Sequence, residues 1–306
     1  MKLKIEVEVL NHTLPSPEDW KFHLDLWQNP YAVARYYQVP LWSKKHFEAM
    51  RPIMKKLADT GQKVITATIM HKPWNGQTLD LFNSMVTKIK KIDGTWSYDY
   101  TVFDRWVELM TGLGIDHTIN CYSMLPWNNE LHYRDGVTGR FVDVTADPGT
   151  PAFEELWVPF LTDFTGHLRE KGWLGRTNIA MDERSPEEMT DALDLLRKTA
   201  PELGIAMADN KNSYLRYPFI NSMCVKVRDR VPPKHIAERR AQGFVTTYYV
   251  CCSDRFPNMF TFSDPAEAVY AGWYTAACGY DGFLRWAYNS WVGEPLTDSR
   301  FRTFPA

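Results

Sequence analysis

The chain has 306 residues, of which 44% are hydrophobic and 24% charged, and its formal net charge is −2. This composition excludes an intrinsically disordered or fibrous chain. The near balance of charges predicts a protein that binds neither nucleic acid nor an anionic membrane surface. No apolar run reaches the roughly 18–20 residues of a membrane span, and the charged and aliphatic residues that alternate at the N-terminus do not resemble a signal peptide.

The N-terminal residues 1–30 are predicted to form a short β segment separate from the rest of the chain. They contain two candidate strands, Leu3–Leu10 and Trp20–Leu26, joined through a proline-rich connection. Two strands without a partner sheet are marginally stable. The segment is therefore expected either to pack on the following domain or to be the remnant of a β-sandwich.

From residue 31 onward, short β-rich runs alternate with amphipathic segments of helical length. The predicted strands are Val33–Gln38, Lys63–Met70, Asp116–Ser123, Thr177–Asp182, Gly204–Asp209, Ile220–Val227, Phe244–Cys252 and Gly282–Tyr288. The predicted helices are Ser43–Thr60, Tyr100–Gly112, Phe153–Lys171, Pro186–Ala200, Pro233–Gln242 and Pro265–Cys278. This alternation predicts one α/β domain over residues 31–306, a (β/α)8 TIM barrel. A doubly wound open sheet is the alternative, but it would normally carry a glycine-rich first turn, which the sequence lacks.

The composition and the cysteines give weaker signals. Aromatic residues make up 14% of the chain, and their flat rings suit either the stacking of sugars or a large aromatic core. The five cysteines lack the spacing of a zinc or redox motif, so we expect all of them to be small buried side chains. They are Cys121, Cys224, Cys251, Cys252 and Cys278.

Barrel enzymes place their chemistry at the carboxyl ends of the strands, and the acidic pair Asp182-Glu183 follows the apolar run Ile179–Met181 at such an end. Side chains alternate along a strand, so both carboxylates reach one pocket only if the strand ends between them. Mutual repulsion tends to keep one of two neighbouring carboxyls protonated, as glycosidic cleavage requires. A solvated strand end or a helix entry is the alternative interpretation.

The other strand ends exclude several chemistries. They carry aromatics and amides but no metalloprotease motif, glycine-rich phosphate cup or nucleophile elbow, so the sequence predicts no metal and no cofactor. His71 is the one histidine at such an end, where a hydrogen-bonding or buried role suits it better than metal ligation.

The run Asn178–Arg184 resembles the catalytic strand of glycoside hydrolase family 123, a family of retaining, exo-acting β-N-acetylgalactosaminidases. Similar matches are Arg35–Ser43, Tyr248–Cys252, Pro257-Asn258 and Asp281–Trp291, so the resemblance spans nearly the whole chain. Two departures are that family members carry an N-terminal β-sandwich and continue beyond the point where this chain ends. The resemblance therefore implies an excised or truncated catalytic domain.

The resemblance implies substrate-assisted catalysis, in which the 2-acetamido oxygen of the sugar attacks C1. Carried onto this sequence, Asp182 orients the acetamido group, and Glu183 protonates the departing oxygen and then deprotonates water. The candidates for holding the sugar are Arg35, His71, Trp74, Asn210, Tyr214, Tyr248, Trp286, Asn289 and Trp291.

Three alternatives stay open from the sequence. A β-N-acetylglucosaminidase would use the same apparatus. A sugar-binding barrel without turnover is the second alternative, and the intact pair Asp182-Glu183 argues against it. Asp209, after the fifth predicted strand, is the rival residue for a conventional nucleophile paired with Glu183.

Overall fold

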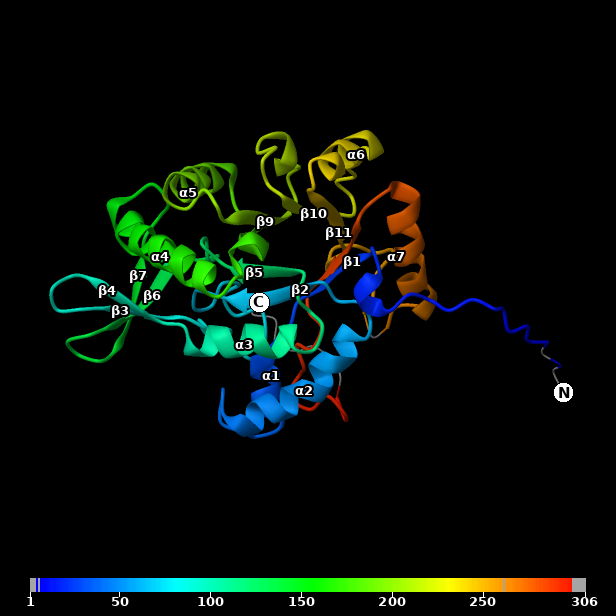
Figure 1. The fold of residues 1–306 in the computed structure, drawn as a ribbon, viewed down its shortest axis with the longest axis horizontal. Helices are drawn as coiled ribbons and strands as arrows, with labels where there is room; N and C mark the ends of the chain where they lie inside the picture. Colours follow the sequence, from blue (N-terminus) through cyan, green and yellow to red (C-terminus); the bar gives the residue numbers. More distant parts are fainter. Residues whose placement is uncertain (1–3, 5, 261, 299–306) are drawn as a thin grey trace.

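The structure is a computed structural model that describes residues 4, 6–260 and 262–298. Eight parallel strands form one sheet in the order β1-β12-β11-β10-β9-β8-β5-β2, which curls into a nearly closed barrel with helices between the strands (Figure 1). These strands are β1 (His23–Leu26), β2 (Val64–Thr68), β5 (Thr118–Tyr122), β8 (Thr177–Asp182), β9 (Gly204–Asp209), β10 (Ser222–Lys226), β11 (Val245–Tyr249) and β12 (Gly282–Arg285). The predicted (β/α)8 barrel is confirmed.

Six of the seven helices in the described part of the chain lie where the sequence predicted a helix, and α1 was not predicted. These seven helices are α1 (Pro30–Tyr36), α2 (Lys44–Ala58), α3 (Thr101–Thr111), α4 (Pro151–Glu170), α5 (Pro186–Thr199), α6 (Pro233–Ala241) and α7 (Pro265–Cys278). Ser43 and Ser185 accept hydrogen bonds from the backbone N–H groups of His46 and Glu188, as expected of N-caps. Within the described part of the chain, no helix has both the length and the hydrophobicity that a membrane crossing requires.

The prediction for the first barrel strand was wrong. Val33–Gln38 belongs mostly to helix α1, because Asn29 caps the N–H groups of Tyr31 and Ala32 and Pro30 occupies the first helical turn. The first barrel strand is instead β1, which pairs in parallel with β12. The barrel therefore begins before residue 31, and the described residues of Leu3–Leu10 lie in no strand.

Side-chain amides join β1 to β2, where the strand ladder is reduced to one isolated bridge between Leu24 and Gln62. The Gln28 side chain accepts a hydrogen bond from the N–H of Thr66 at 2.8 Å, and the Gln62 side chain accepts one from the N–H of Leu26 at 2.9 Å. Gln62 also donates to the carbonyl of Val64 at 2.7 Å. These two buried glutamines satisfy backbone groups that would otherwise be orphaned inside the protein.

The inside of the barrel is filled unevenly. β8, β9 and β10 present small inward side chains, whereas β1 and β5 bring Trp27 and Tyr122 into contact at a ring separation of 4.5 Å. The small residues are Ala180, Ala206, Ala208 and Cys224. Because bulky side chains normally fill a barrel interior, this imbalance leaves room above the small residues.

A second, four-stranded sheet was not predicted, and Figure 1 shows it projecting from one side of the barrel beyond α4. It consists of β3 (Thr87–Lys90), β4 (Trp96–Asp99), β6 (Glu130–Asp135) and β7 (Phe141–Thr145). These strands are inserted in the connections that follow β2 and β5. The second sheet thus connects the loop that follows β2 with the loop that follows β5, both of which begin at the carboxyl ends of the barrel strands.

The buried carboxyl group of Asp25 in the barrel wall is expected to make the stability of the fold depend on pH. Asp25 lies in the middle of β1, 4% exposed, and its Oδ1 has no hydrogen-bond partner among the described residues. Burial raises the pKa of Asp25 from 3.8 to about 7, against a smaller opposing effect of the Trp27 indole. The folded state therefore binds this proton more tightly than the unfolded chain, and ionisation of Asp25 weakens the fold.

We expect Asp25→Asn to stabilise the protein increasingly as the pH rises from about 4 to 8, since asparagine carries no charge to desolvate. The gain at pH 8 should be a few kcal/mol, or roughly 5 °C or more in Tm, and should largely vanish near pH 4. Thermal unfolding at both pH values measures it, with Asp116→Asn at an exposed position as the control. An equal change in Tm at both pH values would contradict the prediction.

Candidate active site

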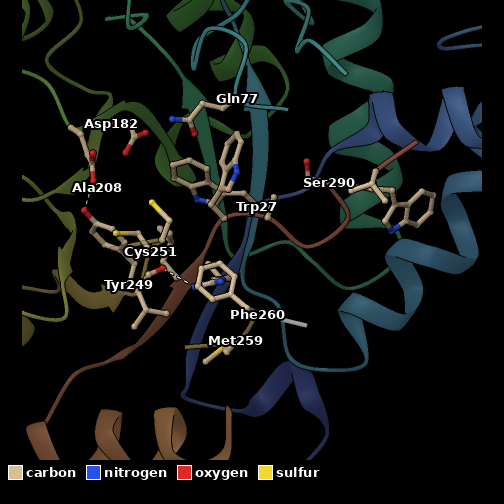
Figure 2. A pocket seen from close by; sticks show the side chains of 18 of the residues that line it. Trp27, Gln77, Asp182, Ala208, Tyr249, Cys251, Met259, Phe260 and Ser290 are labelled. Carbon is tan, nitrogen blue, oxygen red and sulfur yellow. Dashed lines mark hydrogen bonds between the residues drawn. The ribbon is translucent and has the colours of Figure 1, made fainter. Parts of the chain in front are cut away.

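A cavity of about 510 Å³ opens at the carboxyl ends of the barrel strands, within the size range of ligand pockets. Its walls come from the ends of β1, β8, β9, β11 and β12 and from loops that include those after β2 and β5 (Figure 2). Trp27, Trp127, Trp286 and Trp291 supply aromatic surface, and Asp182 and Glu183 are the acidic residues among the described residues that line it. The cavity lies over Ala208, on the side of the barrel where the inward residues are small.

Both carboxylates reach this cavity because the backbone changes conformation between them. Asp182 is the last residue of β8, and Glu183 follows in the left-handed region with φ of 47°. This conformation is unfavourable for a residue with a side chain, by about 1–2 kcal/mol. The N–H of Glu183 still donates to the carbonyl of Ala208 in β9 at 2.9 Å, which anchors the turn to the sheet.

The surroundings of Asp182 raise its pKa. Burial raises the pKa of Asp182 well above its usual value, and the negative charge of Glu183 raises it further. The indoles of Trp74 and Trp127 and the guanidinium of Arg184 act in the opposite direction. Burial thus disfavours the charged form of Asp182, and a positive charge beside it would favour that form.

Tyr249 holds the second carboxylate, and sequence reasoning missed it. The hydroxyl of Tyr249, at the end of β11, donates a hydrogen bond to Oε1 of Glu183, marked by a dashed line in Figure 2. Burial, and then this hydrogen bond, raise the pKa of Tyr249, so the phenol keeps its proton. Alternation along β11 places Tyr249 in the interior and its neighbour Tyr248 on the opposite face.

Arg184, the residue after the acidic pair, anchors the loop that carries Trp127. Arg184 is 9% exposed, donates to the carbonyl of Trp127 at 2.8 Å and forms an ion pair with Glu188 in the first turn of α5. Trp127 in turn donates its indole N–H to the carbonyl of Asp182 at 3.1 Å. The β8 end, the loop after β5 and the start of α5 are therefore joined by one hydrogen-bonded network.

Two of the nine expected sugar-binding residues line the cavity, namely Trp286 and Trp291. Arg35 and Asn289 lie behind its wall. The guanidinium of Arg35 pairs with Asp80 at 2.7 Å and donates to the carbonyl of Trp291 at 2.8 Å. Asn289 accepts from the N–H of Asn29 at 2.8 Å and donates to its carbonyl at 2.7 Å, so it joins the ends of β1 and β12.

The other five lie outside the lining. Trp74 packs beneath Trp286 at a ring separation of 4.9 Å, and His71 faces His132 at 4.5 Å. Tyr214 bonds to His235 at 3.2 Å. Asn210 follows β9, and Tyr248 donates to the carbonyl of Ala271 in α7 at 2.7 Å.

Asp209, the rival nucleophile, faces away from the cavity. It continues the outward row of Ile205 and Met207 on β9, is fully buried, and accepts a hydrogen bond from the N–H of Ser213 at 2.5 Å. The structure therefore places Glu183 beside Asp182 and not beside Asp209. Within the described ranges, no group of three His, Cys, Asp or Glu side chains is arranged to hold a metal ion.

A (β/α)8 barrel with paired carboxylates in an aromatic cavity has the architecture and site of a glycoside hydrolase. The family model for the catalytic domain of glycoside hydrolase 123 matches residues 27–306. The chain therefore belongs to glycoside hydrolase family 123.

A solved structure supports this assignment. A family 123 glycoside hydrolase from Clostridium perfringens, described in a study of glycolipid glycan hydrolysis, superposes with a TM-score of 0.90 at 33% identity. The match covers 97% of this chain and 54% of that one, so the chain spans about half the length of this relative. A maltogenic α-amylase from Thermotoga neapolitana matches 75% of this chain and 59% of its own at 11% identity and a TM-score of 0.38, which is too weak to support an argument. No curated protein sequence matches the chain.

The neighbouring tyrosines of β11 are expected to respond differently to removal of their hydroxyls. Tyr248→Phe removes one of the hydrogen bonds to the carbonyl of Ala271, which still accepts from the hydroxyl of Thr275, and should cost about 1 kcal/mol of unfolding free energy with kcat/KM unchanged. Tyr249→Phe removes the hydrogen bond to Glu183 and should lower kcat/KM by about 10–100-fold with little change in Tm. Kinetics and thermal unfolding of both variants test this, and a larger kinetic effect of Tyr248→Phe would contradict it.

Proposed function

We propose that this barrel removes terminal β-linked N-acetylgalactosamine from glycans or glycolipids, with retention at C1 and with the acetamido group of the substrate as the nucleophile. The observation that carries the proposal is the pair Asp182 and Glu183, which turn into one cavity at the end of β8. The relative from Clostridium perfringens, described for glycolipid glycan hydrolysis, supports the substrate class.

In the first step, the acetamido oxygen attacks C1 as the glycosidic bond breaks. In the reactive complex the proton of the pair lies on Glu183 and Asp182 is ionised. Glu183 donates this proton to the departing oxygen, and Tyr249 holds that carboxyl in place. The acetamido nitrogen becomes positively charged in the oxazolinium ring that forms. Asp182 accepts the N–H of this group and, ionised, stabilises the new charge.

In the second step, water attacks C1 from the side that the leaving group vacated. Glu183, now a carboxylate, takes the proton of the water, and the bond between C1 and the acetamido oxygen breaks. The proton that Glu183 lost in the first step is restored, and the sugar leaves in the β configuration. Trp286 and Trp291 provide ring faces against which the apolar side of the sugar stacks.

Among the residues that the structure describes, the lack of a suitable nucleophile other than the acidic pair supports the internal nucleophile. A conventional retaining enzyme needs two carboxyls about 5 Å apart on either side of C1. Among the described lining residues, Asp182 and Glu183 are adjacent in sequence, and Asp209 faces away from the cavity. Under this proposal, Arg35 and Asn289 support the cavity wall from behind.

Glu183→Gln should lower turnover of natural glycans by about 10²–10⁴-fold, because glutamine neither donates nor accepts the catalytic proton. The loss should be smaller for aryl glycosides with acidic leaving groups, which depart with little protonation. Steady-state kinetics on a series of aryl β-N-acetylgalactosaminides measures the dependence on the leaving group. Turnover of a natural glycan close to that of the unaltered protein would remove Glu183 from this role.

Removing the acetamido group from the substrate should abolish cleavage. We expect an aryl β-galactoside to be hydrolysed at least about 10³-fold more slowly than the matching N-acetylgalactosaminide, since an intramolecular nucleophile is lost. Asp182→Asn should lose about 10²–10³-fold in kcat, because a neutral amide stabilises the oxazolinium ring poorly.

Asp209→Asn is the matched control and should keep the kinetics of the unaltered protein, because Asp209 faces away from the cavity. Comparable hydrolysis of the galactoside, or a glycosyl ester trapped on Asp209, would refute the internal nucleophile. The matching N-acetylglucosaminide, included in the same assay, tests the stated preference for the galacto configuration.

A further inference from the structure

The five cysteines do not share one environment, contrary to the expectation from the sequence. Cys121, Cys224 and Cys278 are buried, whereas Cys251 is half-buried and Cys252 is exposed, and all five are free. Both Cys251 and Cys252 line the active-site cavity together with Asp182 and Glu183. Figure 2 shows Cys251 on the same side of the cavity as Tyr249.

Two adjacent side chains face one cavity here because β11 ends at Tyr249, before the pair. Beyond it, the N–H of Cys251 donates to Oδ2 of Asp254 at 2.8 Å, and the N–H of Asp254 donates to the carbonyl of Cys251 at 3.1 Å. Asn258 donates its side-chain amide to the same carbonyl at 2.8 Å. This turn ends the strand alternation that would have separated the two thiols.

A fixed cation accompanies the two thiols. Arg285 lines the same cavity, and its guanidinium donates to the carbonyl of Val250 at 2.8 Å and to Asn258 at 2.9 Å. Burial lowers the pKa of Arg285.

We propose that Cys251 and Cys252 form a dithiol site that binds trivalent arsenicals at the active-site cavity. Adjacent Cα atoms are about 3.8 Å apart, below the roughly 4.4–6.8 Å found across disulfides, so one bridging atom suits the pair better than a direct sulfur–sulfur bond. A soft thiophilic atom prefers thiolate ligands. No third His, Cys, Asp or Glu is arranged with them as a metal ligand in the described residues, whereas zinc takes four ligands.

The reaction with an organoarsenic(III) oxide is balanced without an oxidant. Each sulfur forms one bond to arsenic, the arsenic–oxygen bond breaks, and the oxygen leaves as water with the two thiol protons. Arsenic stays trivalent throughout. The adduct occupies the cavity wall next to Tyr249 and excludes the substrate. This loss of activity rests on the proposed function, but the binding itself does not.

Phenylarsine oxide is the probe, and intact-mass spectrometry of the folded chain is the direct readout. We expect one adduct per chain at stoichiometric reagent, with a parallel loss of aryl N-acetylgalactosaminide hydrolysis. A small dithiol should reverse both, whereas an excess of a monothiol should not, because only a dithiol offers arsenic two sulfurs in one molecule.

Cys251→Ser and Cys252→Ser should each lose the adduct that resists the monothiol, and Cys278→Ala should keep it. Activities are normalised to those of each untreated variant, and circular dichroism confirms that each is folded. Retention of the resistant adduct by either serine variant, or an adduct mapped to a buried cysteine, would overturn the proposal. So would an adduct that leaves hydrolysis intact. If the untreated protein hydrolyses no glycoside, the proposed function fails, and the mass of the adduct still decides the dithiol site.

Discussion

The site depends on one backbone feature, the left-handed conformation of Glu183 directly after β8. A continued strand would send Asp182 and Glu183 to opposite faces of the barrel wall, one towards the cavity and one towards the helices. The turn costs about 1–2 kcal/mol, and the structure holds it through the bond from Glu183 to Ala208 and through buried Arg184. The strain is thus located at the two residues that the proposed mechanism needs side by side.

The second constraint is the uneven filling of the barrel interior. Small inward residues on β8, β9 and β10 leave space, while Trp27, Trp74 and Tyr122 form a packed aromatic floor on the other side. The same arrangement that makes room for a ligand also buries Asp182 and raises its pKa. The shape of the cavity and the pKa of Asp182 therefore have one cause, the burial of this carboxyl. In the proposed mechanism, the positive charge that develops on the substrate offsets the cost of ionising Asp182.

Much of this fold was predictable. Seven of the eight barrel strands coincide with runs of apolar residues in the sequence, and serine or proline marks the start of most helices. The first strand was missed because β1 is only four residues long and α1 contains the β-branched and aromatic residues of an apparent strand. Asn29-Pro30 was the available signal, since it is a typical helix start. The second sheet was missed because its short strands lie in segments between the predicted barrel elements, which the sequence analysis assigned to neither a helix nor a strand.

At the site, sequence reasoning selected Asp182, Glu183 and Tyr248, and the structure places the two acidic residues and Tyr249, not Tyr248, in the cavity lining. Alternation separates Tyr248 from Tyr249, but only the register against β12 shows which of them faces inward. Arg35 and Asn289 lie at the predicted edge yet support the wall from behind, which depends on contacts with Trp291 and Asn29 that are far away in sequence. The sequence pattern predicts which residues lie at the carboxyl ends of the barrel strands. Whether such a residue reaches the cavity depends on how its side chain packs against other parts of the chain.

The thiazoline derived from N-acetylgalactosamine, a stable analogue of the oxazolinium ring, tests the account most directly, and calorimetric titration measures its affinity. The account predicts binding at least about 10²-fold tighter than that of N-acetylgalactosamine, with most of this advantage lost in Asp182→Asn. Binding no tighter than that of the free sugar, or an undiminished advantage in Asp182→Asn, would contradict it.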